Sequence, residues 1–225
     1  MVGGTHRTRL DGAARRETIL TAAIPEFAAS GYERTRIADI AGNVGVTEPV
    51  VFQNFGTKSG LFIAVLERTS EEVVRYLAAL GDHSANVANV LSGLLAHEHL
   101  DRMHGPGGFG TMFAEAANSA EPAIRKAGRR AHAQTVQGVV QLLRRGQKEG
   151  SIRDDVEATT LGWLLLSQIH ARHFRRAHSV TSAVLERAFL EGLLTALRPP
   201  GHAGRVSSGR THRSPGGLTR HRPAS

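Results

Sequence analysis

Residues 35–58, with the sequence TRIADIAGNVGVTEPVVFQNFGTK, constrain the fold of this chain more than any other stretch. Apolar residues recur at helical spacing on both sides of a glycine-containing break, which predicts two short helices joined by a tight turn. The first helix carries Ile37, Ile40 and Ala41, and the second carries Val50, Val51, Phe52 and Phe55. Gly45 lies where the turn needs a positive φ, and Thr35 and Thr47 are the expected N-caps of the two helices.

Two short helices joined by a glycine turn are typical of a helix-turn-helix, whose second helix enters the major groove of DNA. The pattern leaves open whether the second helix starts at Thr47 or Glu48, because Pro49 disfavours helical angles in the residue before it. Thr57 is the expected N-cap of the next helix. The N-terminus of that helix and the ammonium group of Lys58 together predict a phosphate contact.

The same region resembles the TetR/AcrR family of transcriptional regulators. The resemblance covers about residues 15–66 and rests on Gly31-Tyr32-Glu33-Arg34-Thr35, Ile40-Ala41, Gly45-Val46-Thr47, Phe52-Gln53-Asn54-Phe55, Lys58 and Leu61-Phe62. It implies a homodimeric repressor that binds a palindromic operator in double-stranded DNA and is released by a small-molecule effector. Two alternatives stay open: a ligand-independent or architectural DNA-binding protein and, in another class, an all-α enzyme.

By this resemblance, the residues expected to face the groove or the phosphates are Thr35, Arg36, Thr47, Glu48, Pro49, Val50, Gln53, Asn54, Thr57 and Lys58. Gln53 can pair with adenine, and Asn54 with adenine or phosphate, so the choice of base reader stays open. Phe52 stands where the family has a tyrosine. Because it lacks the hydroxyl that would bind a phosphate, we expect it to serve mainly in packing.

Composition narrows the possible classes of protein. The 225 residues can form one or two domains, and the absence of cysteine excludes disulfides and thiolate metal sites. No apolar run approaches the roughly 20 residues of a membrane span, and no signal-peptide core follows the basic start. We therefore expect a cytoplasmic, bacterial protein that joins the nucleoid when bound to DNA. The formal charge of +8 and the isoelectric point near 11.0 favour a polyanionic partner.

Helical periodicity continues through most of the chain, with no alternating strand pattern, so the expected fold is all-α. An amphipathic helix should span 15–30, with a kink at Pro25 and an end at Gly31. Later helices are expected at 58–80, 84–102, 108–119, 121–149, 154–176 and 181–197. The predicted domains are a flexible basic arm at 1–12, a three-helix DNA-binding domain at 13–56, a helical regulatory and dimerisation domain at 57–198 and a disordered tail at 199–225.

The predicted tail has five arginines and no acidic residue, with many prolines and glycines. Such a composition cannot bury a core. Two interpretations stay open: extra non-specific affinity for DNA, or no function.

Large apolar side chains in the C-terminal half predict an effector cavity, because ligand pockets are mostly apolar with a few polar groups. Its expected lining is Leu94, His97, Met103, Phe109, Met112, Phe113, Gln134, Trp163 and Gln168. The expected ligand is an apolar or aromatic, uncharged compound. The last two helices are more apolar than one buried face requires, and in the family such helices pair across a dimer. Their expected contacts are Leu161, Leu165, Ile169, Leu185, Phe189 and Leu193.

Other patterns fail as catalytic or metal sites. Residues 105–110 match GxGxxG but lack the preceding strand of a dinucleotide-binding unit. His97 and His99 are two residues apart on different sides of a helix, and HExxH is absent. No nucleophile elbow or other catalytic set is present. We therefore expect no metal, no cofactor and no enzymatic activity.

Overall fold

The computed structural model describes residues 12–83, 86–96, 98–100, 109–177 and 183–200, and every regular element in these ranges is an α-helix. The elements are α1 (Gly12–Arg34), α2 (Ile37–Val44), α3 (Glu48–Phe55), α4 (Lys58–His83), α5 (Val87–Leu94), α7 (Phe109–Ala117), α8 (Pro122–Lys148), α9 (Ala158–Ala177) and α10 (Ala183–Leu197). The prediction of an all-α fold is confirmed. Most of the predicted arm and tail lies outside the described residues.

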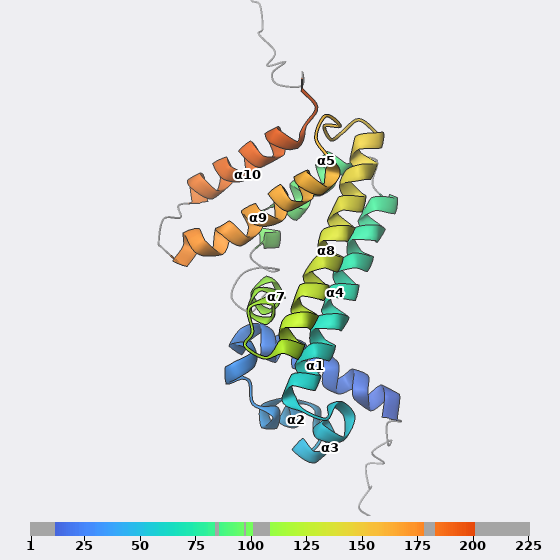
Figure 1. The fold of residues 1–225 in the computed structure, drawn as a ribbon, viewed down its shortest axis with the longest axis vertical. Helices are drawn as coiled ribbons and strands as arrows, with labels where there is room; N and C mark the ends of the chain where they lie inside the picture. Colours follow the sequence, from blue (N-terminus) through green and yellow to red (C-terminus); the bar gives the residue numbers. More distant parts are fainter. Residues whose placement is uncertain (1–11, 84–85, 97, 101–108, 178–182, 201–225) are drawn as a thin grey trace, which may run out of the picture.

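The long helices α4 and α8 lie side by side along the long axis of the molecule (Figure 1). Helices α1–α3, here called the head, gather at one end of this pair, and α9 and α10 lie towards the other (Figure 1). The head shares a buried core with the start of α4, and this core includes Phe27 of α1 and Phe62 of α4. That core also takes in Met112, Phe113 and Ala116 of α7, so the head packs directly against the regulatory half. The domain boundary expected at residues 56 and 57 stays a prediction.

Local signals explain the start and end of the head helices. Gly45 has the left-handed angles φ 68° and ψ 34°, as the turn requires, and its N–H bonds back to the end of α2. The helix α3 starts at Glu48 after the N-cap Thr47, which decides between the two predicted starts. Within α1 the non-helical angles lie at Gly31 and not at the predicted kink, Pro25.

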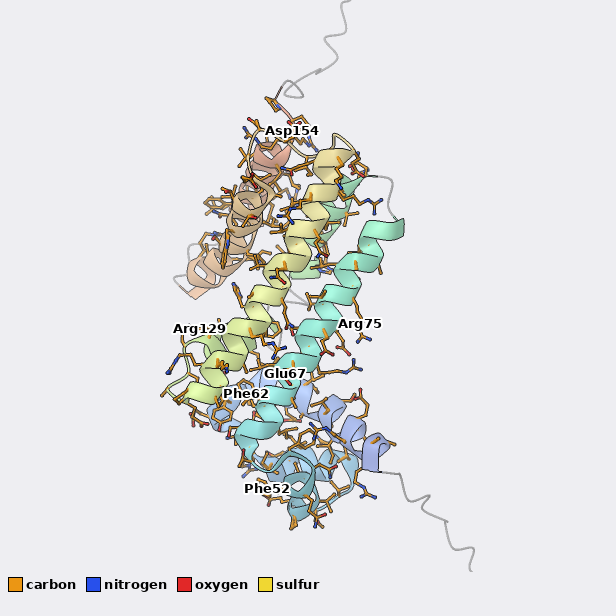
Figure 2. The ribbon with its side chains drawn as sticks, turned by 45° about the vertical axis from the view of Figure 1, so that its right-hand side comes forward. Phe52, Phe62, Glu67, Arg75, Arg129 and Asp154 are labelled. Atoms are coloured by element: carbon orange, nitrogen blue, oxygen red, sulfur yellow. The ribbon has the colours of Figure 1, made fainter. Side chains whose placement is uncertain are left out.

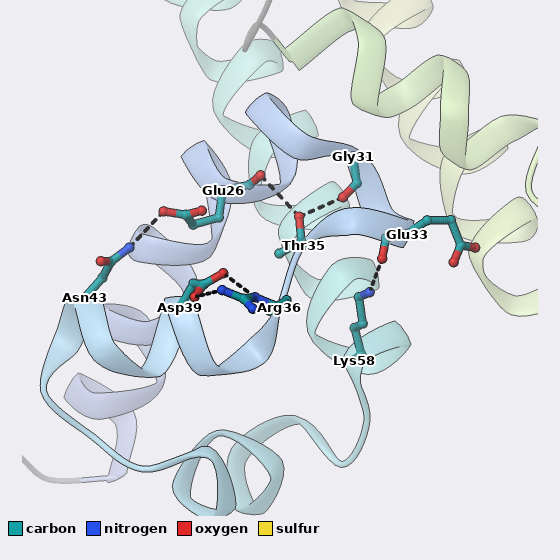
Figure 3. Close-up of polar contacts among 8 residues, drawn as sticks. All are labelled: Glu26, Gly31, Glu33, Thr35, Arg36, Asp39, Asn43 and Lys58. Atoms are coloured by element: carbon teal, nitrogen blue, oxygen red, sulfur yellow. Dashed lines mark hydrogen bonds and ion pairs between the residues drawn. The ribbon is translucent and has the colours of Figure 1, made fainter.

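Thr35 is not the N-cap of α2, as predicted. The N-cap is Arg36, and Thr35 is buried with only 4% of its surface exposed. Its hydroxyl donates to the carbonyl of Gly31 at 2.7 Å and also contacts that of Glu26 at 3.2 Å (Figure 3). Thr35 therefore closes the end of α1 instead of opening α2.

Two predicted helices of the C-terminal half differ from the observed ones. The helix expected at 84–102 is interrupted, because α5 begins after the cap Asn86, whose side chain accepts from the Asn89 N–H, and ends at Leu94. The helix expected from residue 154 begins at Ala158. The Gln147 side chain donates to the carbonyls of Arg153 and Val156, which holds the preceding segment in a non-helical turn.

A buried ion pair joins α9 to α10. The Arg175 guanidinium donates to both carboxylate oxygens of Glu186 at 2.7 and 2.9 Å, and Arg172 lies 3.7 Å from the same carboxylate. A bidentate arginine–carboxylate pair fixes geometry as well as charge. It sets which faces of the two helices remain exposed.

Candidate nucleic-acid interface

Helix α3 presents one exposed side at the end of the molecule. Val51 is buried beneath it, whereas Thr47, Glu48, Pro49 and Gln53 are exposed. Val50 and Asn54 are partly buried. The structure thus brings six of the predicted contact residues together on one short helix and its cap, a size and shape that fit a major groove.

Phe52 also belongs to this exposed side, contrary to its expected role in packing. Its ring is 40% exposed and lies at the end of the molecule opposite Asp154 (Figure 2). The missing tyrosine hydroxyl removes a phosphate contact, but it does not bury the ring. An exposed phenylalanine can make an apolar contact with a thymine methyl group, so Phe52 joins the candidate base-reading residues.

Contacts with α1 hold α2 and α3 in place. The Arg16 guanidinium lies 4.1 Å from the centre of the Phe55 ring and donates to the Asn54 carbonyl. At the other helix, the Asn43 amide donates to the Glu26 carboxylate at 2.8 Å (Figure 3). The exposed side of α3 is therefore carried on a fixed support.

The remaining predicted contacts divide into exposed and internal side chains. Arg36 is exposed and pairs with Asp39 at 3.1 Å (Figure 3), so a phosphate contact has to replace or share that partner. The side chain of Thr35 is buried and bonded inside the protein, and its predicted contact with DNA is wrong for that reason.

Thr57 and Lys58 stand at the start of α4. The Thr57 hydroxyl accepts from the Gly60 N–H at 2.9 Å, which confirms it as the N-cap. The ammonium of Lys58 donates to the Glu33 carbonyl at 2.9 Å (Figure 3). It also lies 4.9 Å from the centre of the Tyr32 ring. Lys58 thus ties α4 to the end of α1, a role that its predicted phosphate contact does not explain.

Tyr32 was not singled out as a functional residue, yet it contacts several elements. Its ring lies 5.1 Å from that of Phe62, and its hydroxyl donates to Glu121 at 2.8 Å. Its N–H donates to Glu115 at 3.0 Å. Burial, followed by the hydrogen bond to the Glu121 carboxylate, raises the pKa of Tyr32 to about 12. No pattern in the sequence shows these partners, because they follow more than 80 residues later.

A second candidate site is an apolar cavity of about 110 Å³ between α4, α5, α7, α8 and α9. Its lining is Val73, Tyr76, Leu77, Leu91, Leu94, Leu95, His99, Leu100, Gly110, Phe113, His132, Thr135, Val139, Leu142, Leu165, Leu166 and Ile169. Two of the predicted lining residues, Leu94 and Phe113, belong to it. His99, which was expected as one of the polar groups of the cavity, also belongs to it. The polar members Tyr76, His132 and Thr135 were not predicted, since nothing in their spacing distinguishes a cavity wall from a surface.

Several predicted lining residues lie elsewhere. Met112 is in the core of the head, and the Gln134 amide oxygen accepts from the Ser70 hydroxyl at 3.0 Å. Trp163 is 49% exposed, and Gln168 borders separate hollows beside α10. Residue type suggested these positions, but the crossing of the helices turns them away from the cavity. His97, Met103 and the side chain of Phe109 lie outside the described residues.

Comparison with known proteins supports the reading of the head. Residues 19–65 match the family model described as "Bacterial regulatory proteins, tetR family". A stretch of 73 residues is 38% identical to the HTH-type transcriptional activator FasR of Mycolicibacterium smegmatis, covering 32% of this chain and 33% of that protein. The chain thus matches about a third of the length of this relative.

Solved structures extend the similarity of fold to most of the chain. A TetR-family regulator from Cytophaga hutchinsonii superposes with a TM-score of 0.68 at 18% identity, covering 85% of this chain and 98% of that one. FadR from Bacillus subtilis, in complex with stearoyl-CoA, superposes with a TM-score of 0.62 at 14% identity, covering 81% and 99%. Residues 19–65 of the chain are thus similar to the DNA-binding region of TetR-family regulators, and most of the chain has the fold of a solved TetR-family structure.

The dimer contacts expected for a TetR-family protein are only partly exposed. Leu161, Leu165 and Leu193 are buried within the protomer, and Ile169 is partly buried at the cavity wall. Leu193 also borders the hollow between α9 and α10 on the outer side. Contact of these four residues with a partner stays a prediction. The exposed apolar surface, here called the α9–α10 face, is formed by Leu164, Gln168, Leu185, Ala188, Phe189, Gly192 and Ala196. Leu185 and Phe189 are the two predicted contacts that it contains.

No helix in the described part of the chain is long and apolar enough to cross a membrane. The predicted histidine set is mostly untested, because His97 and His104 lie outside the described residues. His99 stacks on Tyr76 in the cavity wall, with ring centres 6.3 Å apart.

Proposed function

We propose that this chain is a DNA-binding transcriptional regulator whose helix α3 reads the major groove of a palindromic operator. The observation that carries the proposal is the exposed side of α3, held on α1 through Arg16 and Asn43. Gln53 and Phe52 are the proposed base readers, because both are exposed on the middle of the helix. Thr47, Arg36 and the N-terminus of α4 are the proposed phosphate contacts.

The regulator acts as a homodimer in this proposal. Two copies of the α9–α10 face would bury their exposed apolar side chains against each other in an isologous contact. Such a two-fold arrangement is what places two reading helices about 34–36 Å apart, one turn of DNA. The predicted boundaries, with DNA binding before residue 57 and dimerisation after it, are part of the same proposal.

An uncharged apolar or aromatic compound is the proposed effector, and the cavity is its site. None of the described residues that line the cavity is Asp, Glu, Lys or Arg, and a charged ligand would lose its hydration without a partner. A cavity of about 150 Å³ is known to hold benzene. This cavity, at about 110 Å³, is smaller, so a larger effector must move its walls, and this movement supplies the difference between DNA-bound and released states.

Repression relieved by the effector is the proposed direction of control. FasR is named an activator, and this favours activation as the second candidate. Repression and activation would use the same reading helix and would differ in where the operator lies relative to the promoter. A ligand-independent architectural role would instead give binding with little preference for sequence.

The test begins with selection of the full-length protein on random DNA duplexes, followed by footprinting of the recovered sequence. One short palindrome protected by a dimer supports the proposal, and uniform coating of all duplexes contradicts it. Uncharged lipophilic compounds are then screened for a rise in melting temperature together with release of the selected duplex. Val139→Phe, which fills the cavity, should abolish both effects, whereas Trp163→Ala, outside the cavity, should retain them.

A further inference from the structure

Helix α7 belongs to the cavity and to the core of the head at once. Gly110 and Phe113 line the cavity, while Met112, Phe113 and Ala116 are part of the head core. Phe113 does both, with 7% of its surface exposed. Since packed cores do not deform continuously, an occupant that displaces Phe113 must move α7 against α1.

Polar contacts at the end of α7 reach the end of α1. The carboxylate of Glu115 accepts from the Tyr32 N–H at 3.0 Å. The same carboxylate lies against Gly31, where an added Cβ would stand 2.9 Å from the nearer oxygen. Glu121, the N-cap of α8, accepts from the Tyr32 hydroxyl at 2.8 Å. Two carboxylates from the regulatory half thus bind the same residue of the head, Tyr32, one at its N–H and one at its hydroxyl.

Tyr32 is well placed to pass a movement on to the reading helix. Its ring packs against Phe27 of α1 and Phe62 of α4, with ring centres 6.5 and 5.1 Å away. Lys58, directly after the α3–α4 turn, lies over the same ring and bonds to the next residue, Glu33. A shift of Tyr32 therefore acts on the end of α1 and on the start of α4, which precede and follow the α2–α3 segment.

We propose that Glu115 is a positioning residue that transmits occupancy of the cavity through α7 to the head. The inference rests on the proposed function, in which the cavity takes an effector and the head binds DNA. It assigns the transmission to the contact between α7 and α1, and not to a separate link between the head and α4. That separate link is the ion pair between Arg68 of α4 and Glu17 of α1, at 2.8 Å.

The test measures amide hydrogen exchange of residues 48–55 in the full-length protein, without DNA or ligand. Val139→Phe fills the cavity from a buried lining position, and Leu142→Phe serves if the first variant fails to fold. Filling the cavity should change the amide exchange rates of α3 by about fivefold or more, as expected of coupled sites. In a Glu115→Ala background the same filling should leave α3 unchanged. Glu115→Gln keeps an oxygen that accepts from the Tyr32 N–H, so it should retain the response.

Glu17→Ala is the matched control, because it removes a carboxylate of the head that pairs with the long helix α4 and does not contact α7. The inference is overturned if filling the cavity alters α3 equally with and without the Glu115 carboxylate, if Glu17→Ala abolishes the response instead, or if the wild-type background shows none. Binding of the same variants to duplex DNA is measured separately. Failure of every variant and of the wild type to bind DNA would reject the proposed function and leave the exchange result standing.

Discussion

Side chains on α3 divide into those that face outward and those that hold the helix in place. Gln53 and Phe52 are exposed, whereas Val51 is buried and the Asn54 amide bonds back to the Val50 carbonyl at 2.7 Å. The Asn54 amide therefore already donates a hydrogen bond within its own helix, and Gln53 is the stronger candidate for reading adenine. The sequence alone left this choice open, because both residue types suit the same base.

Gln53→Ala should relax the preference for one or two base pairs by about 1–3 kcal/mol, since a bidentate contact to a base is lost. Thr57→Ala should weaken binding to all duplexes alike, because it loosens a helix N-terminus that faces phosphates. Binding to the selected operator and to its single-base variants measures both effects. Equal loss of sequence preference in the two variants would contradict the assignment.

The pKa of Tyr32 gives a residue-scale test of the contact with Glu121. Because the pKa rises from 10.0 to about 12 on folding, the folded state holds this proton more tightly than the unfolded chain does. The resulting stabilisation is complete below pH 10, declines as the pH rises and is lost above the folded pKa of about 12.

A titration of tyrosinate absorbance, taken as the difference between wild type and Tyr32→Phe, should show this step near pH 12. In Glu121→Gln the step should move towards the ordinary tyrosine value, because a neutral amide no longer opposes the phenolate. A Tyr32 step at the ordinary value in the wild type would mean that the bond to Glu121 does not persist in solution.

At the scale of elements, helix ends set by local chemistry could be predicted and those set by distant contacts could not. Gly45 and Thr57 mark boundaries through backbone angles and capping, which depend on neighbouring residues only. The start of α9 depends on Gln147, a side chain of another helix. The outward face of α9 was also not predictable, because Leu161, Leu164 and Leu165 are alike in sequence and differ only in what packs against them.

The junction between α1 and α2 provides the test at this scale. Gly31 has φ 76° and ψ 170°, a region that is essentially restricted to glycine. Gly31→Ala should therefore destabilise the protein by about 1–3 kcal/mol from backbone strain, with a further cost from the approach to Glu115. Gly42→Ala, in open space within α2, should stabilise it by about 0.5–1 kcal/mol. Denaturant unfolding without DNA compares the two, and equal effects would refute the strain argument.

At the scale of the whole molecule, the apolar side chains that the protomer leaves uncovered decide how two copies can meet. Phe189 and Leu164 are 44% and 39% exposed, and on the α9–α10 face they surround a shallow hollow that includes Gly192. A bulky residue at that glycine tests the dimer without disturbing the protomer. A Cβ added at Gly192 would meet no atom within 4 Å in the protomer, and replacing glycine within a helix favours folding.

Gly192→Leu should therefore leave the stability of the protomer unchanged or raise it, yet separate the two copies of the α9–α10 face. Overpacking at an interface costs about 1–3 kcal/mol, so the dimer dissociation constant should rise by about fivefold or more. Sedimentation measured over a range of protein concentrations detects this shift, and affinity for the palindromic operator should fall with it. Leu193→Ala, one position along but buried in the protomer, should instead lower the melting temperature with a smaller effect on association. A Gly192→Leu protein that remains as dimeric as the wild type would show that the partner binds elsewhere.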